Sequence, residues 1–150
     1  MMVGEGPGGT ENETGVPFTG KAGDKLEKIL FKIGWCEGIY LTNVVKCRPP
    51  NNRVPTIEEQ NVCEEWLIKE INILKPQGII CLGRTASEFF LRKTNQACAG
   101  TLRGKIFKWN TNVIYCTWHP AALLYSESSF KEAELQYDLA TFKTIISTFV

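Results

Sequence analysis

The feature that most constrains the fold of this chain is a set of short apolar segments that run directly into polar loops. The clearest is residues 78–83, which hold only Ile, Cys and Leu between two glycines. Continuous apolar runs of this length are typical of strands buried on both faces of a sheet. Residues 39–45 have the same apolar, β-branched character, and residues 1–4 form the end of another such run. These segments therefore predict strands of a parallel sheet.

Amphipathic segments separate the predicted strands. Four of them predict helices, at residues 20–33, 56–74, 84–93 and 130–149. Thr56 and Glu59 have the spacing of a capping box at the start of the second helix. Residues 106–115 predict a hairpin whose second arm continues to His119. The alternation of strands and helices predicts a three-layer α/β/α fold with a central four-stranded parallel sheet.

Length and composition favour a single domain over residues 1–150. An apolar content of 43% suffices for one ordinary core, and a net charge of +1 neither favours nor excludes nucleic acid. We recognise no signal peptide and no apolar run of membrane length, so we expect a cytoplasmic monomer that does not act on membranes. The six cysteines are then expected to be reduced thiols or metal ligands.

Polar residues capable of holding a ligand follow the predicted strands. They are Glu5, Asn43 and the only histidine, His119. In open α/β sheets, ligands bind at the carboxyl ends of the strands. Phe18 lies on a glycine-rich turn, residues 15–23, and can stack on a planar ligand, although core packing is the simpler alternative for a lone Phe.

Basic residues cluster in two loops. One cluster contains Lys46, Arg48 and Arg53, and the other contains Arg103, Lys105 and Lys108. Most such clusters are solvated faces. Their position beside the strand ends nevertheless favours phosphate contacts.

Four motifs occur in order along the chain: Gly-Glu-Gly-Pro-Gly-Gly at 4–9, the turn at 15–23, Thr-Asn-Val-Val-Lys-Cys-Arg-Pro-Pro at 42–50, and His-Pro-Ala-Ala-Leu-Leu at 119–124. Together they resemble the family 4 uracil-DNA glycosylases, from Val3 to about Leu124. The resemblance implies a DNA-repair enzyme that flips uracil out of DNA and hydrolyses its N-glycosidic bond, leaving an abasic site. It also implies that uracil-containing DNA is the partner.

The resemblance implies roles for the residues that contact the base. Phe18 stacks on uracil. The amide of Asn43 accepts from uracil N3–H and donates to O4, a pattern that cytosine reverses. A turn asparagine bonded to its own backbone is the alternative. His119 donates to uracil O2, where charge develops as the bond breaks, although lone histidines are more often structural.

The first motif carries further expected roles. Gly6 and its neighbouring amides contact the base or water, at a position where family 1 enzymes have an Asp. Glu5 either orients the water or braces its loop. Glu11 matches a carboxylate beside the pyrimidine C5, with a solvated loop acid as the alternative.

DNA contacts are expected on the rim of the pocket. Lys46, Arg48 and Arg103 are the candidates for phosphate contacts. Leu123, or its neighbour Leu124, matches the apolar wedge that fills the gap left by the flipped base, with core packing of both leucines as the alternative. Tyr125 departs from the family, which usually has an Arg there.

Cys47 and Cys63 are fifteen residues apart, the spacing of two ligands of the family's [4Fe–4S] cluster. Such clusters usually need four thiolates. The other two belong to a Cys-x-x-Cys ahead of the first strand, and this chain lacks it, so we expect an N-terminally truncated domain with two of four ligands. Cys36 and Cys98 are possible substitutes, whereas Cys81 and Cys116 are expected to be core thiols.

Two other functions compete with excision. A non-catalytic DNA- or nucleotide-binding module could keep the pocket without turnover, which the missing segment favours. A flavodoxin-like nucleotide domain would share the sheet but would not account for the His-Pro loop or for the spacing of Cys47 and Cys63.

Overall fold

The computed structural model describes residues 1–94, 101–125 and 128–149. Its sheet has five strands in the order β2-β1-β3-β5-β4. The strands are β1 (Met2–Gly4), β2 (Leu41–Asn43), β3 (Gly78–Leu82), β4 (Ile106–Trp109) and β5 (Asn112–Thr117). β2, β1, β3 and β5 pair in parallel, which confirms the predicted four-stranded parallel sheet. β4 adds an antiparallel edge strand through the predicted hairpin.

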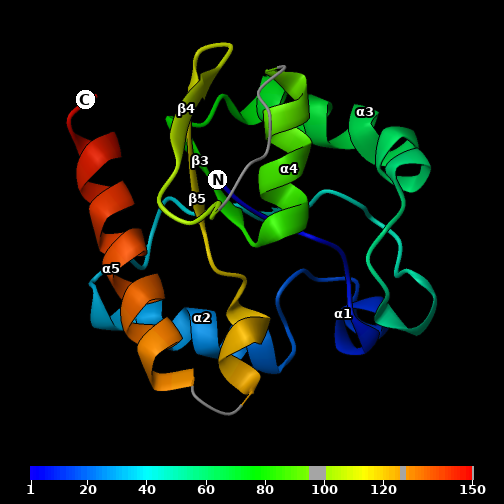
Figure 1. Ribbon diagram of the computed structural model, residues 1–150, viewed down its shortest axis with the longest axis horizontal. Coiled ribbons are helices and arrows are strands. Elements are labelled where there is room, and N and C mark those ends of the chain that lie inside the picture. Colours follow the sequence, from blue (N-terminus) through cyan, green and yellow to red (C-terminus); the bar gives the residue numbers. More distant parts are fainter. Residues whose placement is uncertain (95–100, 126–127, 150) are drawn as a thin grey trace.

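Helices cover both faces of the sheet, so the three-layer prediction is confirmed (Figure 1). One layer contains α3 (Ile57–Leu74) and α4 (Arg84–Lys93). The other contains α2 (Lys21–Lys32) and α5 (Ser128–Ser147). No helix among the described residues is long and apolar enough to cross a membrane.

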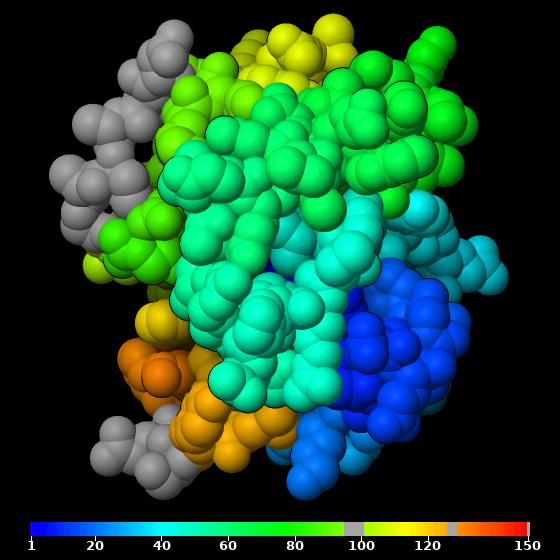
Figure 2. Space-filling view, turned by 90° about the vertical axis from the view of Figure 1, so that its right-hand side faces the viewer, coloured from blue at the N-terminus to red at the C-terminus, as the bar shows by residue number. Residues whose placement is uncertain are grey.

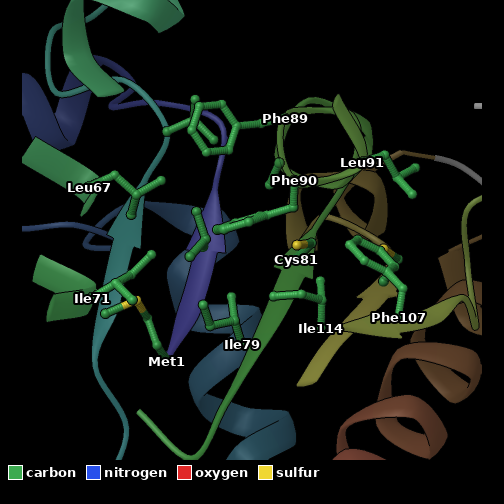
Figure 3. Close-up of a cluster of buried hydrophobic side chains, with 14 of the residues drawn as sticks. Met1, Leu67, Ile71, Ile79, Cys81, Phe89, Phe90, Leu91, Phe107 and Ile114 are labelled. Carbon is green, nitrogen blue, oxygen red and sulfur yellow. The ribbon is translucent and has the colours of Figure 1, made fainter. Parts of the chain in front are cut away.

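Side chains of successive strand residues alternate between two cores. Ile79 and Cys81 pack with Leu67 of α3 and Phe90 of α4, in the core drawn in Figure 3. Ile80 points to the opposite face, which packs against α2 and α5 through Leu26, Ile29, Leu135, Leu139 and Phe142. This period-two alternation on a sheet buried on both sides explains why the strands are apolar throughout.

The helix signals in the sequence correspond to real boundaries. The hydroxyl of Thr56 accepts from the Glu59 amide at 3.2 Å, and the Glu59 carboxylate accepts from the Thr56 amide at 2.9 Å, which confirms the predicted capping box. A short helix that the sequence did not predict, α1 (Gly9–Thr14), follows the first loop. It has no buried residue, so it shows no apolar periodicity.

Strand β2 is shorter than the predicted segment 39–45. Only Leu41–Asn43 pairs with β1 as a regular strand. The amides of Val44 and Val45 nevertheless donate to the carbonyls of Gly4 and Glu5, at 2.9 and 3.1 Å. The loop after β1 and the loop after β2 are thereby held together beyond the ends of the two strands.

Candidate active site

Three predicted ligand-binding side chains converge on the end of β1. A Cβ built on Gly4 would lie 2.6 Å from Oδ1 of Asn43, 2.7 Å from Cζ of Phe18 and 3.3 Å from Nε2 of His119. These residues come from β2, from the turn before α2 and from the loop after β5. The parallel sheet brings them together because its strands all end at this edge. Gly4 has to be glycine, since any side chain would fill the space between them.

Phe18 is held in a conformation that non-glycine residues rarely adopt, with φ of 57°. Such strain is tolerated where the surroundings enforce it, commonly at functional sites. Here the start of α2 enforces it: a Cβ on Gly23 would lie 1.8 Å from the Phe18 carbonyl oxygen. Gly23 therefore allows the turn to lie directly on the helix, which aims the Phe18 ring at the pocket.

His119 connects β5 to the 3-10 helix η2 (Pro120–Leu124). Its Nδ1 accepts a hydrogen bond from the Ala121 amide at 3.0 Å. Burial lowers the pKa of the imidazole from 6.5 to about 4, against a smaller opposing effect of Glu11. The ring is therefore neutral at pH 7. Because Nδ1 acts as acceptor, the single ring proton lies on Nε2, the atom that faces Gly4.

Asn43 occupies the last position of β2 and is only 7% exposed. Its side-chain amide makes no hydrogen bond within the described part of the chain, so the alternative of a turn asparagine bonded to its own backbone does not apply. Buried amides are normally paired. The amide is thus available to pair with a ligand in the pocket.

The carboxylate of Glu11 joins two loops of the site. Oε2 accepts from the Gly8 amide at 3.2 Å, and Oε1 accepts from the Gly20 amide at 3.1 Å. Glu11 therefore has a structural function that the sequence alternative, a solvated loop acid, did not include. It still lines the pocket.

Glu5 and Gly6 lie in the loop after β1 and also line the pocket. Oε2 of Glu5 accepts a 2.6 Å hydrogen bond from the Thr85 hydroxyl of α4, which braces the loop. A Cβ on Gly6 would lie 2.6 Å from Cγ2 of Val45. The loop therefore packs too closely on Val45 for an Asp at this position.

The residues enclose a pocket of about 570 Å³, which is sufficient for a nucleobase and part of its sugar. Six of the predicted site residues line it: Glu5, Gly6, Glu11, Phe18, Asn43 and His119. Leu124 and Tyr125 lie at its rim. The rings of Phe18 and His119 stack within it. The pocket can hold a planar base, read its polar edge and donate a hydrogen bond to it.

Comparison with known proteins identifies the family. The model of the uracil DNA glycosylase superfamily matches residues 1–143. The chain belongs to the uracil-DNA glycosylase superfamily. It is 42% identical to a type-4 uracil-DNA glycosylase of Pyrobaculum aerophilum, over 95% of this chain and 75% of the relative. A type-4 uracil-DNA glycosylase of Thermotoga maritima is 40% identical, over 97% of this chain and 77% of the relative.

The chain is also similar, at lower identity, to uracil-DNA glycosylases of another type. A type-5 uracil-DNA glycosylase of Pyrobaculum aerophilum is 33% identical over 82% of this chain. The higher identity and coverage of the type-4 relatives confirm the resemblance to family 4 that the four motifs indicated.

Leucines 123 and 124 have different environments in this member of the superfamily. Leu123 is 2% exposed and belongs to the core beneath α2 and α5. Leu124 is 44% exposed at the rim of the pocket. The burial of Leu123 argues against a direct DNA contact by its side chain, and Leu124 is the exposed leucine of the two.

The predicted phosphate contacts also differ in their surroundings. Arg48 is exposed, and its guanidinium lies against Gly9 at the start of α1 while Nε donates to Asn52 at 2.7 Å. Figure 2 shows α1 beside the 46–56 loop on one face of the molecule. Arg103 instead donates to both carboxylate oxygens of the buried Asp138, at 2.8 and 2.9 Å. Lys46 is similarly bound to acceptors within the protein.

The cysteines do not form a metal site within the described residues. Cys47 is exposed, and Cys63 packs partly against the core beneath α3. No group of three or more His, Cys, Asp or Glu is placed to hold a metal ion in the described ranges. These residues therefore offer two of the four thiolates that a [4Fe–4S] cluster needs and do not fit it by themselves. Cys36 is exposed, and Cys98 lies outside the described residues.

Several functional positions were not recognised in the sequence. Gly4, Gly23 and Gly83 matter because of close approach; a Cβ on Gly83 would lie 2.8 Å from Cβ of His119. Thr85 and Glu70 lie on helices and contact residues far away in the chain: Thr85 donates a hydrogen bond to Glu5, and Glu70 forms an ion pair with Lys46. A glycine or a helical polar residue carries no local signal of such contacts.

Proposed function

We propose that this chain is a uracil-DNA glycosylase, which hydrolyses the N-glycosidic bond of deoxyuridine in DNA. The observation that carries the proposal is the convergence of Phe18, Asn43 and a neutral His119 on Gly4. The type-4 names of the relatives support the same activity. A duplex base cannot enter this pocket while stacked, so the nucleotide has to be flipped into it.

Recognition of uracil follows from the free amide of Asn43. It accepts from N3–H and donates to O4. Cytosine presents an acceptor at N3 and a donor at C4, so it would leave buried polar groups unpaired, at a cost of roughly 1–3 kcal/mol per group. Phe18 supplies the stacking surface, and Glu11 lines the pocket as the candidate to exclude a methyl group at C5.

Bond breakage requires stabilisation of the departing base. When the bond between N1 and C1′ breaks, its electron pair stays with uracil, and negative charge develops on O2. The Nε2–H of His119 is a preorganised donor for that oxygen. A neutral imidazole holds its Nε2 proton firmly, so the proton stays on His119. The hydrogen bond to O2 strengthens as negative charge grows on that oxygen.

The sugar carbon then bonds to the oxygen of a water molecule, and the proton that this water loses passes through solvent to the uracil anion, which leaves as neutral uracil. Glu5 is the candidate to orient this water with the amides around Gly6, since only one of its carboxylate oxygens is used by Thr85. Positioning carries most of the barrier reduction in such a site.

For the DNA surface we propose that Arg48 contacts phosphate and that Leu124 enters the base stack. We also propose that the chain acts as a monomer inside the cell. Size-exclusion chromatography with light scattering would show a mass near 16.9 kDa if this is correct.

The deciding experiment is to incubate the protein with a single-uracil oligonucleotide and look for alkali-labile sites. Cleavage at uracil, absent with a matched thymine or cytosine strand and lost in Asn43→Ala/His119→Ala, would establish the activity. Binding of the uracil strand without cleavage would favour the non-catalytic binding module instead.

A further inference from the structure

Next to Asn43 lies an ion pair between Lys46 of the 42–50 loop and Glu70 of α3. Nζ of Lys46 donates to Oγ1 of Thr42 at 2.6 Å and to the backbone carbonyl of Asn43 at 2.9 Å. The same nitrogen lies 2.9 Å from Oε1 of Glu70. An ammonium group has three donors. Two hydrogen bonds and one ion pair within the protein therefore engage this ammonium group, which leaves it little capacity for a DNA phosphate.

Burying the charges of this ion pair costs free energy, so the pair contributes little to the stability of the fold. Lys46 and Glu70 are only 27% and 23% exposed, and Oε2 of Glu70 is buried with no hydrogen-bond partner among the described residues. A buried polar atom without a partner destabilises a protein. Replacing buried ion pairs by apolar residues is often neutral or stabilising. Stability alone therefore does not account for these two residues.

The position of Asn43 explains what the pair can do. β2 is an edge strand of three residues, with β1 on one side only. The β1 side fixes Val44 and Val45 through the carbonyls of Gly4 and Glu5. On its other side, the Asn43 carbonyl is held by Lys46, and Glu70 anchors Lys46 to an 18-residue helix that packs on the core.

We propose that Lys46 and Glu70 are positioning residues that fix the base-reading amide of Asn43. The inference rests on the proposed function, because it assigns the pair a role in uracil selection. A misplacement of about 1 Å in an active site can lower the rate by up to 10²-fold. Lys46 then acts through Asn43 and not through DNA, which distinguishes it from a phosphate contact.

The test is a double-mutant cycle that combines Lys46→Met with Asn43→Ala, measured by single-turnover excision from a uracil oligonucleotide. We expect Lys46→Met to lower the rate by about 10-fold or more in the parent and to have no further effect in the Asn43→Ala background. An equal loss in both backgrounds, together with a salt dependence of DNA binding that is reduced by about one phosphate contact, would overturn the proposal.

Melting temperatures distinguish a positioning role of the pair from a role in folding. The apolar double variant Lys46→Met/Glu70→Leu should melt at the parent's temperature or above and still lose excision. Loss of excision only in proportion to unfolded protein would contradict positioning. The matched control is Lys93→Met, which breaks the pair between Lys93 and Glu64 that also joins α3 to a neighbouring segment at similar exposure. It should leave excision per folded molecule unchanged.

One readout does not depend on turnover. Amide hydrogen exchange of Val44 and Val45 reports the position of the loop even if the parent cuts no uracil, which would refute the proposed function separately. Faster exchange of these two amides in Lys46→Met, but not in Lys93→Met, would support the positioning role. Unchanged exchange would overturn it.

Discussion

The rings of Phe18 and His119 stack with centroids 5.9 Å apart and planes inclined by 26°. The Phe18 ring covers one face of the imidazole and adds to the burial that lowers the pKa of His119. The low pKa of His119 and the strained turn of Phe18 are therefore two aspects of one packing arrangement. That arrangement can be probed directly, because the chain contains a single histidine.

The protonation state of His119 is the first prediction. Its imidazole should titrate at about pH 4, and near neutrality its proton should lie on Nε2. Nitrogen-detected NMR of this single histidine gives both the midpoint and the tautomer. Phe18→Ala should raise the midpoint towards 6.5 by admitting water. A neutral ring protonated on Nδ1, or a parent midpoint near 6.5, would contradict the assigned geometry.

The same pKa predicts how stability depends on pH. In the unfolded chain the imidazole titrates near 6.5, and in the folded chain at about 4. Between these values the unfolded state binds more protons, so the contribution of His119 to the free energy of unfolding is complete above pH 6.5 and decreases as the pH falls to about 4. Thermal unfolding of His119→Gln, which cannot titrate here, should depend less steeply on pH in this range. An identical slope in both proteins would count against the shift.

Removal of the His119 side chain should affect catalysis more than binding. Loss of an oxyanion-type donor typically lowers the rate by on the order of 100- to 1000-fold. We expect His119→Ala to reduce single-turnover excision by this factor while the affinity for uracil-containing DNA changes little. If the variant melts at a lower temperature but excises at the parent rate per folded molecule, His119 has only a structural function.

The two adjacent leucines form a matched pair of variants. Leu123→Ala should lower the free energy of unfolding by about 2–5 kcal/mol, because it empties a core position. Leu124→Ala should leave stability unchanged and reduce excision from duplex DNA more than from single strands, where no stack has to be filled. Denaturant titrations and excision rates on both substrates test this. Equal effects on single and double strands would remove Leu124 from the wedge role.

Gly4→Ala tests the centre of the pocket. The new methyl group would lie well inside contact distance of both Asn43 and Phe18, so both side chains have to shift. We expect a large loss of excision with the fold retained, as judged by circular dichroism. Excision at the parent rate would show that the three side chains do not converge on Gly4 as described.

Most of the fold was predictable from the sequence because apolar runs and amphipathic periods report burial directly. The capping box at Thr56 and the hairpin at 106–115 carry local chemical signals and were confirmed. Helix α1 was missed because it buries nothing and is held by the Glu11 carboxylate and by Gly15 in the left-handed conformation.

The candidate site was predictable only in part. The sequence indicated which loops meet, since strand ends of a parallel sheet share one edge. It could not indicate which of two adjacent leucines faces inward, because η2 is too short to show a period. Nor could it show that Lys46 and Arg103 are bound to Glu70 and Asp138, whose partners are distant in the chain.

The contact between Gly23 and the Phe18 carbonyl has a consequence for redesign of the pocket. Efforts to change base specificity would naturally target Phe18, yet its backbone conformation is dictated by a residue five positions later, inside a helix. Libraries that vary residue 23 should therefore yield mostly inactive clones, whereas Phe18 itself can be exchanged for other aromatic residues. The side chain at position 18 can therefore be varied, whereas the backbone conformation there depends on the packing against α2.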